Sequence, residues 1–289
     1  MSLSQSLFDL TGKTALITGG SSGLGAYFAE VLCDAGAKVA IVARRTDKLE
    51  EVAAAARAKG GDVTTKTCDI VDAERVAEVV DELWSELGRI DILVNNAGTV
   101  GDGGFVPEKL PHAVFGETIQ TNLIGLWTCS QEVGKRMLGD GKGGSIINIT
   151  SVMGMGGAAD HPLAYQTSKA GVINLTRNLA CSWADRGVRV NAIAPAYFPS
   201  EMTGPYLAVP GFEPYVQNAT PMGRLGELDE LAGPLLMLAS AAGSYMTGAL
   251  IPVDGGYSSG VGHSRWTDDI YAGLGTVIPD GGSVHIKPE

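Results

Sequence analysis

The chain has 289 residues, 45% of them hydrophobic and 18% charged, which supplies a large core and excludes general disorder. Its 21 basic and 32 acidic residues give a net charge of −11, so nucleic acid and anionic membrane surfaces are disfavoured as partners. The four cysteines form no C-x-x-C pair, and we therefore predict neither a metal site nor a disulfide framework. The first ten residues include no basic side chain and no apolar run has membrane length, so we expect a cytoplasmic protein.

Short runs rich in β-forming or apolar residues predict seven strands. They span residues 14–18, 38–43, 62–67, 90–94, 145–150, 188–193 and 249–253. Apolar residues between 28 and 35 follow helical spacing and stop at Gly36, and a second such run stops at Gly88. Strands that alternate with helices pair in parallel through right-handed crossovers. We therefore predict a doubly wound α/β fold, with helices on both faces of one sheet.

Two late segments depart from this alternation. Residues 195–226 are rich in proline and are predicted to form a lid over the substrate, and residues 257–289 form a glycine-rich C-terminal extension. We expect a single domain over residues 1–289, with a core of about 10–256. For the extension we expect packing against a neighbouring subunit or over the pocket mouth, rather than metal binding. The side chains concerned are His263, Arg265, Trp266, Asp268 and Asp269.

A glycine-rich turn follows the first predicted strand and leads into the first helix. Glycines let the backbone approach a ligand closely, and the unpaired N–H groups at a helix start attract phosphate. The dinucleotide fingerprint G-x-G-x-x-G is not matched, because Phe28 stands where its third glycine belongs, so a turn without a ligand is the alternative. The candidate cofactor contacts in this turn are Gly19, Ser21, Ser22, Gly23, Leu24 and Gly25.

Two arginines, Arg44 and Arg45, follow the second predicted strand. A carboxylate at this point would indicate NAD, whereas a guanidinium suits the 2′-phosphate of NADP. No acidic side chain follows at once, so NADP(H) is the favoured cofactor and NAD(H) the alternative. Arg44 is the preferred phosphate ligand, and Arg45 fits a ligand and a solvated neighbour of the helix cap equally well.

Tyr165 and Lys169 are four residues apart in a segment predicted to enter a helix after Pro162, so they share one helix face. This spacing lets an ammonium group lie near a phenol. An ordinary tyrosine has a pKa of about 10, so acid/base work near neutrality requires about 4 kcal/mol of phenolate stabilisation. Alone, the Y-x-x-x-K pattern is a common accident on helices.

Taken together, these motifs resemble the short-chain dehydrogenase/reductase family over about residues 10–256, with its Rossmann-type sheet. Within the family the pattern is closest to members that reduce 3-oxoacyl groups or small ketones. The family usually has glycine after the proline that follows strand six, whereas this chain has Ala196. The matching residues are Gly19, Gly23, Gly25, Cys68, Asp69, Ile70, Asn95, Asn96, Ala97, Gly98, Asn122, Ser151, Tyr165, Lys169, Asn191, Pro195, Asp254, Gly255 and Gly256.

The resemblance implies a catalytic tetrad. Tyr165 would exchange a proton with the substrate oxygen, and Ser151 would donate a hydrogen bond to that oxygen. Lys169 would hold the nicotinamide ribose and lower the tyrosine pKa, and Asn122 would position a water that links Lys169 to solvent. As alternatives, Asn122 caps a backbone bend and Ser151 is an ordinary loop hydroxyl. The resemblance also implies cofactor contacts from Asp69, Ile70, Asn95, Ala97, Gly98, Tyr165, Lys169, Pro195, Ala196 and Phe198.

The loops predicted to contact substrate are mostly apolar, which favours a small hydrophobic ketone or secondary alcohol. These positions are Val152, Met153, Met155, His161, Leu163, Tyr206, Leu207, Val209, Phe212 and Tyr215. A reductase of 3-oxoacyl thioesters, on acyl carrier protein or coenzyme A, is the alternative, but no lysine or arginine lies between residues 195 and 220 to attract an acidic carrier. A nucleotide sensor without chemistry is a third hypothesis. The resemblance further implies a homo-oligomer, either a tetramer or a dimer.

Overall fold

The computed structural model of the chain describes residues 2–103, 105–158 and 162–259. Across these residues, seven strands form one sheet in the order β3-β2-β1-β4-β5-β6-β7, and every neighbouring pair is parallel. This architecture confirms the predicted doubly wound α/β fold. The strands are β1 (Thr14–Thr18), β2 (Lys38–Ala43), β3 (Asp62–Thr67), β4 (Ile92–Asn95), β5 (Gly144–Ile149), β6 (Val188–Pro195) and β7 (Leu250–Val253).

The first three strands have the predicted bounds, and the other four differ by one or two residues at one end or at both. Strand β6 ends two residues later than expected, and β4 begins two residues later. Ile90 is fully buried, and the apolar pattern therefore includes it, but the ladder with β1 begins only where Ile92 pairs with Ala15. Burial alone therefore extended the predicted strand beyond its hydrogen-bonded part.

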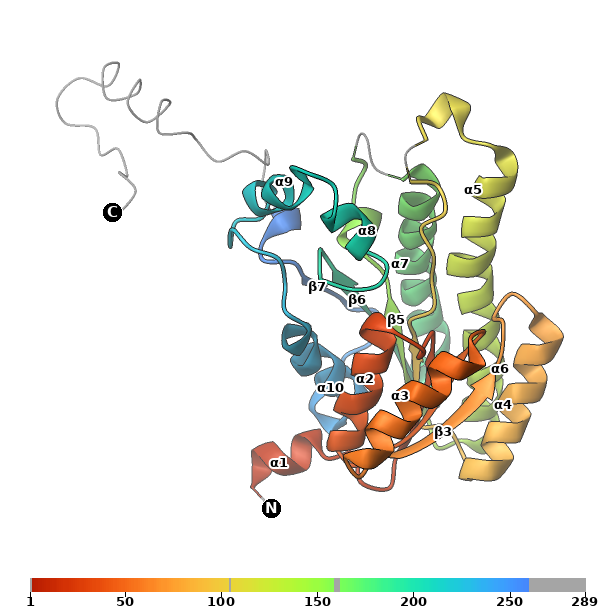
Figure 1. The fold of residues 1–289 in the computed structure, drawn as a ribbon. Helices are drawn as coiled ribbons and strands as arrows, with labels where there is room; N and C mark the ends of the chain where they lie inside the picture. Colours follow the sequence, from red (N-terminus) through yellow and green to blue (C-terminus); the bar gives the residue numbers. More distant parts are fainter. Residues whose placement is uncertain (1, 104, 159–161, 260–289) are drawn as a thin grey trace, which may run out of the picture.

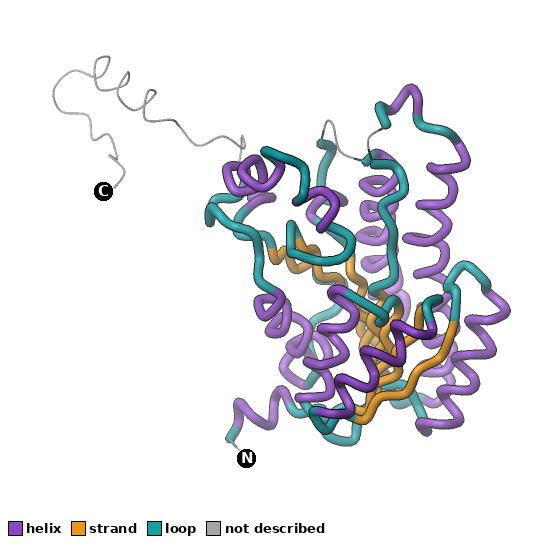
Figure 2. Tube along the Cα trace, viewed as in Figure 1, coloured by secondary structure: helices purple, strands orange, loops and turns teal. Residues whose placement is uncertain are grey.

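Helices cover both faces of the sheet (Figure 1). One face packs against α2 (Gly23–Asp34), α3 (Thr46–Ala58) and α10 (Ala232–Ala239). The other packs against α4 (Ala73–Leu87), α6 (Leu126–Asp140) and α7 (Leu163–Trp183). Figure 2 shows the strands enclosed between these two helical layers. The remaining α-helices of the described residues are α1 (Leu3–Phe8), α5 (His112–Ile119), α8 (Gly204–Leu207) and α9 (Phe212–Ala219).

Local sequence signals explain the ends of these helices. At the start of α4, the Asp72 side chain accepts a hydrogen bond from the Arg75 amide, which satisfies one of the unpaired donors of the first turn. The same helix ends at Gly88 with a φ of 81°, a left-handed conformation that glycine adopts without steric cost. No helix among the described residues is long and apolar enough to cross a membrane.

A buried hydrogen-bond network joins the centre of the sheet to two helices. The Asn95 amide of β4 donates to Ser130 Oγ on α6 at 2.8 Å and to Asn148 Oδ1 on β5 at 2.9 Å. The Asn148 amide in turn donates to Thr176 Oγ1 on α7 at 2.9 Å. Because buried polar groups are costly without partners, these bonds constrain how α6 and α7 sit on the sheet.

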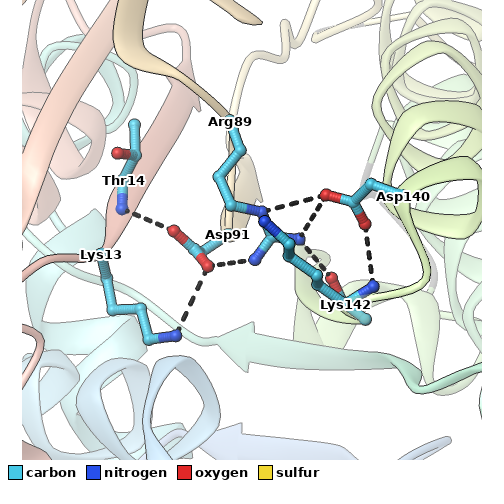
Figure 3. Close-up of polar contacts among 7 residues, drawn as sticks. Lys13, Thr14, Arg89, Asp91, Asp140 and Lys142 are labelled. Atoms are coloured by element: carbon cyan, nitrogen blue, oxygen red, sulfur yellow. Dashed lines mark hydrogen bonds and ion pairs between the residues drawn. The ribbon is translucent and has the colours of Figure 1, made fainter.

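A second polar cluster lies at the amino ends of the strands (Figure 3). The Asp91 carboxylate accepts hydrogen bonds from the Thr14 amide at 3.0 Å, from Lys13 Nζ at 3.4 Å and from the Arg89 guanidinium. Arg89 also pairs with Asp140, at the end of α6, at 3.2 Å. The cluster therefore ties β1 and β4 to α6 at the edge of the sheet where the strands begin.

The predicted lid of residues 195–226 contains the two short helices α8 and α9. The predicted C-terminal extension is described only as far as residue 259, where a short 3₁₀ turn covers Tyr257–Ser259. The expectations for the rest of the extension, from His263 to Asp269, lie outside the described residues.

Candidate active site

A cleft of about 1320 Å³ opens where the strands end. Its walls include the segments that follow five neighbouring strands, β3, β2, β1, β4 and β5, together with Pro195 at the end of β6. In an open parallel sheet this carboxyl edge is the usual ligand site. The cleft exceeds the usual volume of a drug-sized pocket, so it has room for a dinucleotide and a small substrate.

The glycine-rich turn forms one wall of the cleft at the start of α2. Gly19 and Gly23 have φ angles of 69° and 55°, which let the chain turn sharply into the twelve-residue helix. Gly25 was predicted to contact the cofactor, but it does not line the cleft. A Cβ atom at Gly25 would lie 2.2 Å from the Gly19 carbonyl oxygen, so this glycine is required for packing of the turn. The other predicted residues of the turn line the cleft: Gly19, Ser21, Ser22, Gly23 and Leu24.

The two arginines after β2 both line the cleft but differ in their contacts. The Arg44 side chain is 76% exposed and lies 3.8 Å from the Asp69 carboxylate. The Arg45 guanidinium instead forms two hydrogen bonds with the Glu201 carboxylate, at 2.6 and 2.7 Å, and a third with Ser22 Oγ at 2.9 Å. Glu201 was missed by the sequence interpretation, since it lies 156 residues from Arg45 and follows no recognised motif.

The predicted cofactor contacts at the ends of β3 and β4 line the cleft, with one exception. Asp69, Ile70, Ala97 and Gly98 line the cleft, whereas Asn95 does not. The Asn95 side chain points into the buried network, so the prediction that it contacts the cofactor is not supported by its position. The neighbouring Asn96 side chain instead supports the glycine-rich turn. Its amide donates to the Thr18 and Gly19 carbonyl oxygens, each at 3.1 Å.

Three of the four predicted catalytic side chains line the cleft together: Ser151, Tyr165 and Lys169. Helix α7 begins after Pro162, and it places Lys169 one turn beyond Tyr165 with Nζ 5.5 Å from the ring centre. Lys169 Nζ also donates to the Ile149 carbonyl oxygen at 2.9 Å. Ser151 Oγ accepts from the Met153 amide at 3.1 Å, which orients the hydroxyl at the end of β5.

The environment shifts the pKa values of the two ionisable groups on α7. Burial raises the pKa of the Tyr165 phenol, and its hydrogen bond with Ser151 acts in the opposite direction. Burial lowers the pKa of Lys169 to about 8, because the charged ammonium is poorly solvated there. The expected lowering of the tyrosine pKa by Lys169 stays a prediction.

Asn122, the fourth predicted catalytic residue, is fully buried behind the cleft wall. It lies in a π-helical turn, Gln120–Gly125, that joins α5 to α6. Its side chain accepts from the Thr99 amide at 2.8 Å and donates to the Thr99 carbonyl at 2.9 Å and to Ser168 Oγ at 3.1 Å. Asn122 therefore links the segment after β4 to α7, next to the turn that carries Lys169.

The segment predicted to form the lid contributes to the cleft wall. Among the described residues predicted to contact substrate, Tyr206 lines the cleft, together with its neighbours Met202, Thr203 and Pro205. Phe212 packs behind Tyr206, with ring centres 5.9 Å apart. Pro195, Ala196 and Phe198 also line the cleft, as expected. Residues predicted as substrate contacts that do not line it are Val152, Met153, Met155, Leu163, Leu207, Val209, Phe212 and Tyr215, and His161 lies outside the described residues.

The described residues contain no group of three or more histidine, cysteine, aspartate or glutamate side chains that could hold a metal ion.

Comparison with known proteins gives consistent matches over most of the chain. The family model described as Enoyl-(Acyl carrier protein) reductase matches residues 19–258. Galactitol 2-dehydrogenase of Rhizobium johnstonii is 38% identical over 88% of this chain and 98% of its own length. The rhamnolipids biosynthesis 3-oxoacyl-[acyl-carrier-protein] reductase of Pseudomonas aeruginosa is 37% identical over 86% of this chain and 98% of its own. A solved gluconate 5-dehydrogenase from Burkholderia cenocepacia, in complex with NADP and tartrate, superposes with a TM-score of 0.85 at 33% identity, covering 89% of this chain and 100% of that chain.

The comparisons identify the chain as an oxidoreductase, and its doubly wound sheet carries the glycine-rich turn at α2 and the Tyr165–Lys169 pair on the wall of one cleft. The chain belongs to the short-chain dehydrogenase/reductase family.

Proposed function

We propose that this protein is an NADP(H)-dependent oxidoreductase that interconverts a hydrophobic ketone and its secondary alcohol, with Tyr165 as the acid/base. The observation that carries the proposal is the meeting of Ser151, Tyr165 and Lys169 on the wall of one cleft that also contains the glycine-rich turn. In this reaction the bound nicotinamide supplies or accepts the hydride.

The residues of the chain would do the rest of the chemistry. In the reductive direction, the Tyr165 hydroxyl gives its proton to the substrate oxygen, and Ser151 donates a hydrogen bond to the same oxygen as negative charge develops. The Lys169 ammonium, one turn along α7, holds the ribose of the cofactor and favours the phenolate that forms. Asn122 positions the segments around Lys169, through Thr99 and Ser168, so that the proton can be replaced through water.

The cleft fits a dinucleotide phosphate. A Cβ atom at Gly19 would lie 2.7 Å from Ala97 Cα, so the turn leaves no space for a side chain and presents its backbone instead. The start of α2 supplies unpaired N–H groups to phosphate oxygens. The exposed Arg44 guanidinium is positioned to bind a 2′-phosphate, which supports NADP(H), with NAD(H) as the alternative. The gluconate 5-dehydrogenase described above has NADP in its structure.

The substrate end supports a small hydrophobic carbonyl compound. Val100, Met202, Pro205 and Tyr206 contribute apolar surface to the cleft wall, which supports this substrate class. The second candidate is a 3-oxoacyl thioester, because one of the matched relatives is named for that activity. Another relative is named for a polyol, so polyols belong in any substrate test. We further expect a cytoplasmic homo-oligomer, a tetramer or a dimer, whose size light scattering would measure.

The test is cofactor consumption, followed with NADPH and NADH in parallel. The panel comprises alicyclic and aromatic ketones, 3-oxoacyl thioesters and, in the oxidative direction, polyols. Turnover of ketones with NADPH that disappears in Tyr165→Phe supports the proposal. A rate on thioesters far above that on ketones supports the second candidate. Tight cofactor binding without turnover on any member would instead indicate the nucleotide sensor.

A further inference from the structure

The Arg45–Glu201 pair connects two segments of the cleft wall that are far apart in the sequence. Arg45 follows β2, where the adenosine of the proposed cofactor would lie, whereas Glu201 belongs to the segment predicted to form the lid. The guanidinium receives both carboxylate oxygens of Glu201, at 2.6 and 2.7 Å, which is the bidentate geometry that arginine also uses for phosphate. The same guanidinium also donates to Ser22 Oγ, the N-cap residue of α2 in the glycine-rich turn, at 2.9 Å.

The position of Glu201 is set by a braced turn. Ser200 and Thr203 exchange hydrogen bonds, from the Ser200 amide to Thr203 Oγ1 at 2.9 Å and from the Thr203 amide to Ser200 Oγ at 3.2 Å. Thr203 Oγ1 also donates to the Phe198 carbonyl oxygen at 2.6 Å. Glu201 therefore lies on a turn that these hydrogen bonds stabilise, and this turn holds the backbone of Glu201 where its carboxylate reaches Arg45.

The two arginines are consequently unequal as phosphate ligands. Arg44 has a single distant ion pair, 3.8 Å from Asp69, and can turn toward a phosphate at little cost. Arg45 must first give up both hydrogen bonds to Glu201. The carboxylate stays ionised at neutral pH, because Arg45, and after it Ser22, lowers the pKa of Glu201 to about 2.

We propose that Glu201 is a cofactor-selectivity residue: it occupies Arg45 in place of the 2′-phosphate and thereby limits the preference for NADP(H) over NAD(H). This inference rests on the proposed NADP(H)-dependent function. Glu201 acts through Arg45 and is thus a positioning residue. A ligand without the 2′-phosphate does not compete for Arg45, so its affinity is independent of the pair.

The experiment measures dissociation constants of NADPH and NADH by titration calorimetry on the full chain. The variants are Glu201→Gln, Arg45→Gln, the double variant and, as a matched control, Glu51→Gln. Glu51 lies on α3 and pairs there with Lys48 at 2.7 Å, and it does not line the cleft. We expect Glu201→Gln to tighten NADPH binding about fivefold, the factor that corresponds to loss of a favourable exposed ion pair, and to leave NADH binding unchanged.

The double variant separates the proposed cause from a general field effect. When Arg45 is already Gln, the further change at Glu201 should leave the NADPH-to-NADH ratio unaltered. An equal tightening in both backgrounds, or a ratio that Glu201→Gln does not change, overturns the inference. If the wild type turns over ketones with NADPH but Glu201→Gln does not change the NADPH-to-NADH affinity ratio, the proposed function holds and the role of Glu201 is wrong. If the wild type binds neither cofactor, the proposed function and the role of Glu201 are both wrong.

Discussion

The Nζ atom of Lys169 lies 5.5 Å from the centre of the Tyr165 ring, and it donates a hydrogen bond to the Ile149 carbonyl oxygen at 2.9 Å. The lysine is thus held between the end of β5 and the tyrosine on its own helix. Because the ammonium is near the ring, the charge of Lys169 can influence the phenol without contacting its oxygen.

Replacement of Tyr165 by Phe should reduce kcat/KM for ketone reduction by about 10³-fold, since the proton donor is lost while the ring remains. The free energy of unfolding should fall by no more than about 1 kcal/mol, because the ring stays packed and the hydrogen bond of the hydroxyl with Ser151 is lost. Cofactor oxidation and urea unfolding measure the two quantities. Tyr245→Phe, the same chemical change at a fully exposed position, is the control and should affect neither.

The pH dependence should reflect Lys169. Because burial lowers the pKa of Lys169 to about 8, its ammonium is present below that pH and is lost as the pH rises through it. The raised pKa of Tyr165 keeps the phenol protonated, and so able to act as an acid, over the same range. We expect kcat/KM for reduction to fall above about pH 8. A rate profile that stays level through that pH would contradict a catalytic charge on Lys169.

Arg44→Gln should raise the KM for NADPH by about tenfold or more, because a charged hydrogen bond to phosphate is worth about 1.5–3 kcal/mol. The KM for NADH should stay within about twofold of the wild-type value. Steady-state kinetics with both cofactors measure the effect. Arg186→Gln, in the 3₁₀ turn that follows α7 and outside the cleft, provides the matched loss of one exposed guanidinium. Equal increases for both cofactors would indicate that Arg44 does not bind the 2′-phosphate.

Asp91→Asn should lower the free energy of unfolding by about 2 kcal/mol, because the buried carboxylate accepts from Arg89, Lys13 and the Thr14 amide. The change should leave kcat unaltered, since the cluster lies where the strands begin and the cleft is lined by segments that follow the strand ends. Chemical denaturation measures the stability. Asp62→Asn removes an exposed carboxylate 3.8 Å from Lys38 and should cost less than about 0.5 kcal/mol. Equal costs at the two positions would argue against a special role for burial at Asp91.

The sequence predicted the fold, and it predicted which segments gather at the carboxyl edge of the sheet, because both depend on local periodicity. Alternating strands and helices determine a parallel sheet, and residues that directly follow strands then meet at its carboxyl edge. The Tyr165–Lys169 pair was predictable for the same reason, since a separation of four residues places both on one helix face. These inferences need no knowledge of how distant segments pack.

Other features of the site depend on packing and could not be predicted. Gly25 and Asn95 follow the expected motifs, yet they face a neighbouring backbone and a buried network rather than the cleft. The direction of each side chain depends on the rotation of its segment, which sequence spacing does not determine. The Arg45–Glu201 pair joins residues 156 positions apart, and only the folded lid brings them together. The lid also turns Tyr206, but not Leu207, toward the cleft.

The buried network of Asn95, Ser130, Asn148 and Thr176 has a consequence for catalysis, although none of its members lines the cleft. Apolar contacts tolerate small displacements, whereas amide hydrogen bonds require a defined direction and distance. A slip of α7 along β5 by one turn, about 5.4 Å, would leave the Asn148 amide unpaired in the interior. Thr176 lies about three turns along the helix from Tyr165, the proposed acid/base. The buried hydrogen bond between Asn148 and Thr176 therefore determines the axial position of α7 on the sheet. It thereby also determines how far the Tyr165 hydroxyl lies above the strand ends.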